Sequence, residues 1–137
     1  MAMDNEQVPS GIPSNTVILN LAMTSLKDIG EDDFENLTLL KKLDLSQNQL
    51  RYIPQNTFRN LPLLAVINLR DNFISGGFYL PKTIGRLDLL NNLLSSDDLK
   101  VILKGLTKLS YLDVDENKLG PVLSADVFAG LSRLDIL

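Results

Sequence analysis

Carboxylate and amide side chains recur at one position of a repeating pattern, where they could bind a cation or transfer a proton. They stand in the middle of five short apolar stretches: Asn20, Asp44, Asn68, Asp88 and Asp113. If these stretches are adjacent strands, the carboxylates lie close together, and hard cations prefer such oxygen ligands. Two carboxylates with widely separated pKa values could also serve as acid and base. Because Lys42, Arg70 and Arg86 lie alongside and would neutralise the acids, we predict no metal site.

The residue inventory excludes most other site chemistry. The chain has no cysteine and no histidine, which removes thiolate and imidazole ligands, cysteine nucleophiles and the Ser-His-Asp arrangement. Asp97 and Asp98 are the other acidic pair, and they are better explained as favourable charge at the start of a helix. We therefore predict no catalytic residue, no cofactor and no enzyme activity.

The element that positions the central acids is a short repeated unit. In Leu40–Leu50, apolar residues stand at positions 1, 4, 6 and 11 and an asparagine at position 9. The pattern L-x-x-L-x-L-x-x-N-x-L predicts a strand at positions 3 to 5 and a sharp turn at the asparagine. The side-chain amide of that asparagine can satisfy the backbone groups of the turn.

The unit recurs along nearly the whole chain. Its copies start at residues 16, 40, 64, 84, 109 and 134, so they are 24, 24, 20, 25 and 25 residues apart. The first copy has Thr24 at the asparagine position, and the sixth is represented by Leu134 and Leu137. The turn asparagines, predicted to be structural, are Asn48, Asn72, Asn92 and Asn117.

The segments between strands differ from copy to copy. Residues 1–7 are predicted to be a disordered or vector-derived leader, and residues 8–16 an extended cap, because proline disfavours helix there. Three phenylalanines are expected to stack inside the array: Phe34, Phe58 and Phe128. The short third copy should be extended. Residues 95–105 predict one helix of about two turns, with capping residues before it and a glycine after it.

These motifs resemble the leucine-rich repeat family over residues 8–137. The form at residues 40–61 resembles the extracellular, animal-type class. Residues 8–16 are similar to the end of the N-terminal flanking module of Toll-like receptors, small leucine-rich proteoglycans and lamprey variable lymphocyte receptors. Residues 80–84 resemble the short proteoglycan repeats, and residues 51–64 resemble mosquito immune leucine-rich repeat proteins. The flanking modules of these families carry paired cysteines, which this chain lacks.

The resemblance implies an α/β solenoid: a right-handed horseshoe of five repeats and a truncated sixth, with a short-stranded parallel sheet lining its concave face. Side chains that alternate with the core residues should face that concavity in three columns. The first column is Ile18, Lys42, Val66, Arg86 and Tyr111. The middle column is the acid and amide series, and the third is Ala22, Ser46, Arg70, Leu90 and Asp115.

The concave columns are the predicted ligand-binding surface, with a protein as ligand. We expect the contacts to come from Lys42, Asp44, Asn68, Arg70, Arg86, Asp88, Tyr111, Asp113 and Asp115. Basic residues in the second to fourth copies and acidic ones in the fifth suit a mixed-charge protein surface. The net charge of −4 argues against nucleic acid, which requires clustered cations, and no apolar run is long enough to insert into a membrane.

Two interpretations of the setting stay open. The resemblance implies a secreted or cell-surface module of innate immunity or matrix, and Asn36-Leu37-Thr38 would then permit N-glycosylation. The absence of cysteine instead favours an intracellular, cytoplasmic scaffold or regulator. The incomplete sixth repeat has two interpretations as well: an N-terminal fragment of a longer array, or an exposed C-terminal edge that forms a homodimer.

Overall fold

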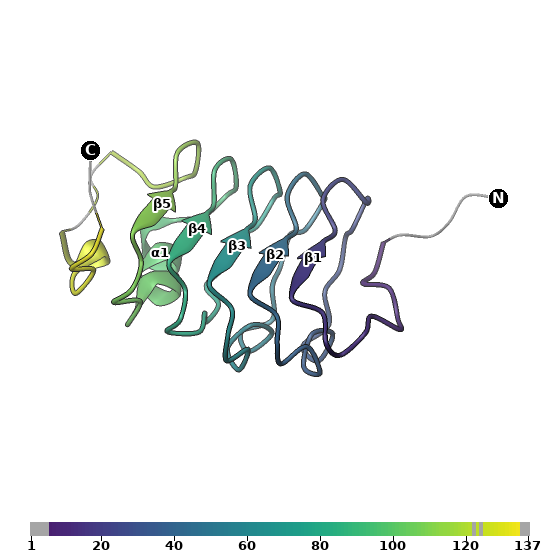
Figure 1. The fold of residues 1–137 in the computed structure, drawn as a ribbon. Helices are drawn as coiled ribbons and strands as arrows, with labels where there is room; N and C mark the ends of the chain where they lie inside the picture. Colours follow the sequence, from purple (N-terminus) through teal and green to yellow (C-terminus); the bar gives the residue numbers. More distant parts are fainter. Residues whose placement is uncertain (1–5, 122, 124, 135–137) are drawn as a thin grey trace.

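A computed structural model describes residues 6–121, 123 and 125–134. Each repeat contributes one short strand to a single parallel sheet (Figure 1). The strands are β1 (Ile18–Asn20), β2 (Lys42–Asp44), β3 (Val66–Asn68), β4 (Arg86–Asp88) and β5 (Tyr111–Asp113). Their order in the sheet is their order in the sequence, which is the topology of a solenoid. The predicted fold is therefore confirmed.

The register of the sheet aligns equivalent positions of all five repeats. Ile18 pairs with Lys42, Lys42 with Val66, Val66 with Arg86, and Arg86 with Tyr111. The middle residues of the unit pair in the same way, from Asn20 through to Asp113. The first and middle columns deduced from spacing are thus continuous rows across the sheet.

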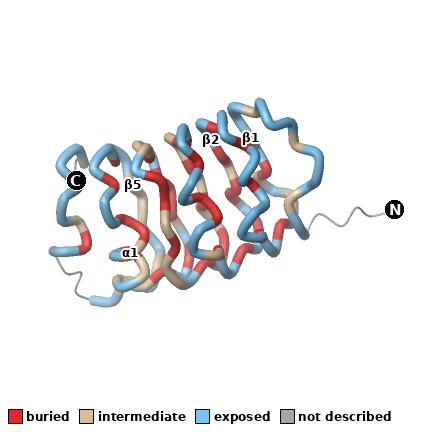
Figure 2. Tube along the Cα trace, turned by 90° about the horizontal axis from the view of Figure 1, so that it is seen from below, coloured by how far each residue is buried: buried red, intermediate tan, exposed pale blue. Residues whose placement is uncertain are grey.

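The core follows from the alternation within each strand. In β2, Leu43 is fully buried while Lys42 is exposed, and Leu45 just after the strand is fully buried again. Successive strand side chains point to opposite faces, so the apolar set turns inward in every repeat and packs on the repeats either side. Figure 2 shows the resulting buried positions recurring along the tube, with exposed turns between them.

The interior phenylalanines form a row that differs from the predicted one. The Phe34 and Phe58 rings lie 5.8 Å apart between centroids, and Phe58 and Phe78 lie 6.2 Å apart. Phe78 takes the third place, not Phe128, which is half-buried in the described structure. The short third repeat explains the change, because its extended segment after Gly77 turns Phe78 directly into the core.

The helix predicted in the fourth repeat is confirmed. Helix α1 (Ser96–Leu103) has Ser95 as N-cap, and the Ser95 hydroxyl accepts a bond from the Asp98 amide while the Asp98 carboxylate accepts one from the Ser95 amide. The same carboxylate also accepts a bond from the Gly76 amide, at 3.1 Å. Asp98 therefore starts the helix and ties it to the preceding repeat. A short 3-10 helix, η1 (Ala125–Phe128), follows in the fifth repeat and was not predicted.

The N-terminal segment is attached to the first repeat earlier than expected. Gln7 forms a parallel bridge with Asp28, and the Glu6 carbonyl accepts bonds from the Lys27 and Asp28 amides. Val8 and Ile12 are partly buried and pack against the core. The residues of the predicted leader that the structure describes, 6 and 7, thus pair with the first repeat, and residues 1–5 lie outside the described part.

Candidate functional site

The turn asparagines connect each repeat to the one before it. The Asn72 amide nitrogen donates to the carbonyls of Leu69 and Arg70 in its own turn, at 3.1 and 3.3 Å, and to Leu45 of the preceding repeat, at 3.0 Å. Its oxygen accepts from the Leu50 amide at 3.1 Å. The repeat pattern predicts the bonds within the turn but not the bonds between repeats.

The same arrangement recurs at the other turn asparagines. The side-chain nitrogen of each donates hydrogen bonds to carbonyls of its own turn and of the preceding repeat. The side-chain oxygen of each accepts a hydrogen bond from a backbone amide of the preceding repeat. These residues are Asn48, Asn92 and Asn117. In the first copy the Thr24 hydroxyl donates to the Leu21 carbonyl at 2.8 Å, which reproduces one bond of the set. The residue before each asparagine or Thr24 has a left-handed φ between 55° and 59°: Met23, Gln47, Asp71, Asn91 and Glu116.

The side chains of the middle column form hydrogen bonds with the backbone at the ends of their own strands. One side-chain oxygen of each member accepts a bond from the backbone amide two residues on, at 2.9 to 3.1 Å: Asn20, Asp44, Asn68, Asp88 and Asp113. This local bond is an Asx turn, which Asp and Asn form readily. Asp88 is moreover 9% exposed. The column therefore offers a ligand much less than its composition suggested.

Arg70, in the third column, forms ion pairs with two carboxylates. Its guanidinium lies 3.5 Å from the Asp71 carboxylate and 3.6 Å from that of Asp88. The other Asp71 oxygen accepts a bond from the Asn91 amide at 3.0 Å. These contacts neutralise Arg70 within the protein, so it is less available to a ligand than the sequence indicated.

The first column is the exposed part of the concave face. Ile18 is 65% exposed and Tyr111 37%, Lys42 and Arg86 are exposed, and Val66 is half-buried. The Arg86 guanidinium lies over the Tyr111 ring, 3.9 Å from its centroid. Such a cation–π contact holds a long side chain in place. This contact was not predicted from the sequence, although the pairing of these two positions in adjacent strands is the signal that indicates it.

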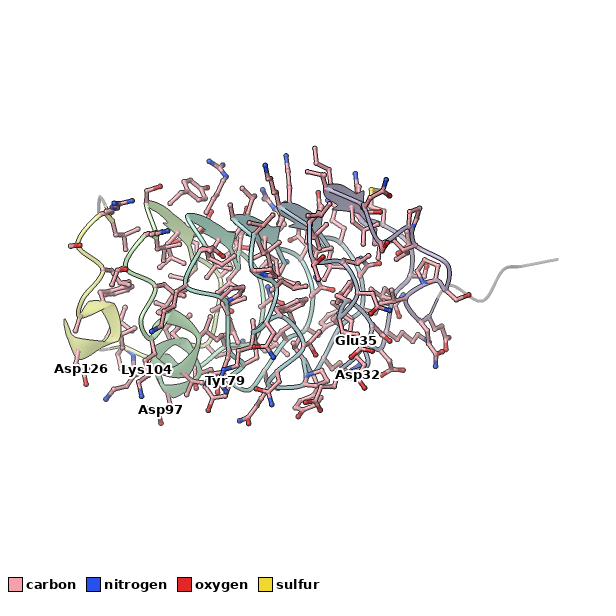
Figure 3. All side chains as sticks on the ribbon, turned by 60° about the horizontal axis from the view of Figure 1, so that its bottom comes forward. Asp32, Glu35, Tyr79, Asp97, Lys104 and Asp126 are labelled. Carbon is pink, nitrogen blue, oxygen red and sulfur yellow. The ribbon has the colours of Figure 1, made fainter. Side chains whose placement is uncertain are left out.

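A second concave feature lies away from the sheet, between α1 and η1. It encloses about 470 Å³ and is lined by residues of both helices and by Tyr79. Figure 3 shows Asp97, Lys104 and Asp126 at this end of the molecule, on the side opposite the strands. The Lys100 ammonium is 2.6 Å from the Asp126 carboxylate, and its hydrogen bond to that carboxylate raises the pKa of Lys100. This ion pair joins the two helices across the cavity.

The remaining predicted groups are placed as follows. Within residues 6–121, 123 and 125–134, no three acidic side chains are grouped so that they could hold a metal ion. Asn36 and Thr38 of the sequon are both exposed, and Leu37 between them is buried. Leu134 is half-buried against the core, while Leu137 lies outside the described residues.

Comparison with known proteins agrees with this architecture. The family model described as leucine rich repeat matches residues 14–74. Osteomodulin of Rattus norvegicus is 34% identical over 134 residues, which are 94% of this chain and 31% of that protein. Epiphycan of Gallus gallus is 34% identical over 112 residues, or 81% of this chain and 35% of that protein.

Solved structures give the same result. The leucine-rich repeat domain of APL1 superposes with a TM-score of 0.77 at 25% identity, covering 94% of this chain and 35% of that one. A complex of LRIM1 with APL1C gives the same TM-score and identity, with 24% of that chain covered.

The repeat unit, the five-stranded solenoid and these matches show that the chain belongs to the leucine-rich repeat family. Within the family it resembles the small leucine-rich proteoglycans osteomodulin and epiphycan and the immune proteins APL1 and LRIM1. It spans about a third of the length of osteomodulin and epiphycan.

The relatives also bear on the class of activity. The chain's family includes non-enzymatic small leucine-rich proteoglycans and immune leucine-rich repeat proteins. None of the helices in the described part of the chain has the length and apolar character needed to cross a membrane.

Proposed function

We propose that the chain is a protein-recognition module that binds a protein ligand through its concave face. The observation that supports this function is the first column, in which five side chains from five adjacent strands are exposed or half-exposed. The fold does not require this combination of side chains, because the core and the turn bonds are built from other positions. The complex of LRIM1 with APL1C contains a related repeat array in a protein assembly.

The concave face alone is too small to form a protein–protein interface of standard size. Five strands spaced about 4.8 Å apart, each about 15 Å wide at its surface, present about 350 Å², well below the ~800 Å² that each partner buries in a standard complex. Further repeats, flanking loops or a second copy would enlarge it. A homodimer through the C-terminal repeat around Leu134 remains part of the proposal, and sedimentation across a concentration series tests it.

A bulky substitution in the first column should weaken the binding of peptides selected on the folded chain. Peptides from a random phage-displayed library are selected on the wild-type protein and then measured against Lys42→Trp. We expect at least a tenfold loss of affinity, because the indole would cover the exposed row between Ile18 and Val66. The matched control is Asn60→Trp, which changes an exposed residue on a turn outside the sheet. Equal losses in both variants would contradict a concave binding surface.

We propose that the protein acts outside the cell, in matrix or innate immunity; the support is that osteomodulin, epiphycan and the APL1 and LRIM1 proteins are extracellular. The absence of cysteine in the whole chain favours the alternative, an intracellular scaffold or regulator, because reducing compartments make disulfides unavailable.

Glycosylation of Asn36 distinguishes the two compartments. The asparagine and the threonine of its sequon are exposed, so a glycosyltransferase can reach them. In protein isolated from its native source, we expect peptide N-glycosidase F to shift the mass by one glycan, and Asn36→Gln expressed in the same cells to lack the shift. An unmodified Asn36 in native protein would favour the intracellular alternative.

A further inference from the structure

We propose that the concave face binds an extended protein segment that places carboxylates over Lys42 and Arg86, with an aliphatic side chain over Val66 between them. The inference rests on the proposed function and adds the chemistry of the partner. The proposal follows from a difference between the concave side chains. Some already form hydrogen bonds or ion pairs within the protein, and others are available to a ligand.

The acidic groups at the centre of the face contribute little to recognition. One oxygen of each middle-column side chain is used by a backbone amide two residues on. Arg70, which faces this column, is paired with Asp71 and Asp88. The polar groups of the middle and third columns over β3 and β4 thus largely satisfy one another.

The cations of the first column are different. In the described part of the chain, no carboxylate forms an ion pair with Lys42 or Arg86. Arg86 is held by its stack on Tyr111, and the edge of a guanidinium stacked in this way still presents its N–H donors. A carboxylate binds such an edge through two parallel hydrogen bonds. Arg86 is therefore a preorganised site for one acidic side chain.

The spacing of the two cations fits one chain crossing the strands. Lys42 and Arg86 belong to β2 and β4, with Val66 of β3 paired to both, so their backbones are about 9.6 Å apart. In an extended segment, side chains on one face recur about every 6.6 Å. Two acidic residues with one same-face residue between them are therefore about 13 Å apart, which is longer than the gap between the cations. A segment that crosses the row at an angle can set its middle residue over Val66, which is only half-buried, and each acidic residue about 4–5 Å to one side of the row. The long Lys42 and Arg86 side chains can reach carboxylates at that distance.

Charge along the face sets the direction and the class of ligand. Beyond Arg86 and Tyr111, the fifth repeat presents the exposed carboxylates of Asp115 and Glu116, which would repel a continuous polyanion. Ile18 and Val66 add apolar surface that a sulfated glycan cannot use. A protein segment with acidic and aliphatic residues at one end and a basic residue at the other matches both halves of the row.

Fluorescein-labelled synthetic peptides of defined charge test the proposal by fluorescence polarisation. The probe alternates serine with the face residues glutamate, valine, glutamate and lysine, and its partner peptide exchanges glutamate for lysine and lysine for glutamate. We expect the first peptide to bind wild-type protein at least tenfold more tightly than the exchanged peptide. Raising the salt concentration should reduce the difference, because exposed charges are screened.

Charge reversal in the protein should invert the preference. The variant with Lys42→Glu and Arg86→Glu should bind the exchanged peptide better than the original one. The matched control reverses two exposed lysines outside the sheet, Lys82→Glu and Lys104→Glu, and should retain the wild-type preference. An equal change in both double variants would show that only net charge matters and would overturn the proposal.

Two other results would also overturn it. If a heparin oligosaccharide binds wild-type protein more tightly than the glutamate peptide does, and Arg86→Glu abolishes that binding, the face recognises a sulfated glycan. If neither designed peptide binds while library-selected peptides still lose affinity on Lys42→Trp, the partner chemistry is wrong and the concave binding surface stands. Failure of the proposed function itself differs, because the selected peptides would then bind Lys42→Trp normally.

Discussion

Replacing Phe58 with alanine should lower the free energy of unfolding by about 3–5 kcal/mol, the usual cost of deleting a buried phenylalanine. Phe58 is fully buried and lies between Phe34 and Phe78, with ring centroids 5.8 and 6.2 Å away. The substitution therefore removes both ring contacts in the row as well as opening a cavity. Because small domains have about 5–15 kcal/mol in total, the variant should be measured by urea denaturation at low temperature.

Two controls separate this row from a general loss of apolar volume. Phe58→Leu keeps most of the buried surface and should cost about 1–2 kcal/mol. Phe128→Ala should cost less than about 2 kcal/mol, because Phe128 is half-buried and the described structure has no ring stacked on it. If Phe128→Ala were as damaging as Phe58→Ala, the row would include Phe128, as the sequence alone indicated.

The strands and the order of the sheet were predictable because one spacing rule determines both. An apolar position that recurs in the same phase forces each copy to turn inward at the same point, so equivalent residues such as Leu43 and Ile67 must pair. The helix was predictable for a local reason, since Ser95 and Asp98 form a capping box whose spacing is visible in the sequence.

The third phenylalanine was mispredicted because repeat length is not a local property. Phe34 and Phe58 both stand 18 residues after the start of their repeats, which are equal in length, and Phe128 stands at nearly the same offset, 19, in the fifth repeat. The short third repeat breaks that rule, because its path from Ser75 to Leu80 has no turn and reaches the core sooner. Contacts between non-equivalent positions of different repeats require the path of the backbone.

The concave site was predicted as a set of positions, but not as a set of available groups. Spacing predicts Asp44, Arg70 and Asp88 as part of the ligand-binding face, and the register of the sheet aligns Asp44 and Asp88 with Asn68 in one row. It could not show that the two aspartates bind backbone amides or that Arg70 pairs with Asp88. Whether a concave side chain is available to a ligand depends on its hydrogen bonds and ion pairs within the protein. Their partners lie two residues on or in the next strand, and composition does not reveal which of them form.

Asn72→Ala should cost about 2–3 kcal/mol of stability. The substitution removes four hydrogen bonds, three donated to carbonyls and one accepted from the Leu50 amide. Asn72 itself is 4% exposed, so these backbone groups would lose a partner in a site that water enters poorly. Leaving a buried polar group unsatisfied costs about 1–3 kcal/mol. Urea denaturation followed by circular dichroism gives the difference from wild type.

The first repeat supplies a graded control for this interpretation. Thr24 stands at the asparagine position and keeps the bond to the carbonyl three residues before it, so Asn72→Thr should restore the Leu69 bond but not the bond to Leu45. Its stability should fall between those of Asn72→Ala and wild type, and the exposed Asn60→Ala should change stability by less than about 0.5 kcal/mol. If Asn72→Ala changed the stability as little as Asn60→Ala does, water would have to replace the hydrogen bonds of the Asn72 side-chain amide. The asparagines would then shape the turns without holding adjacent repeats together.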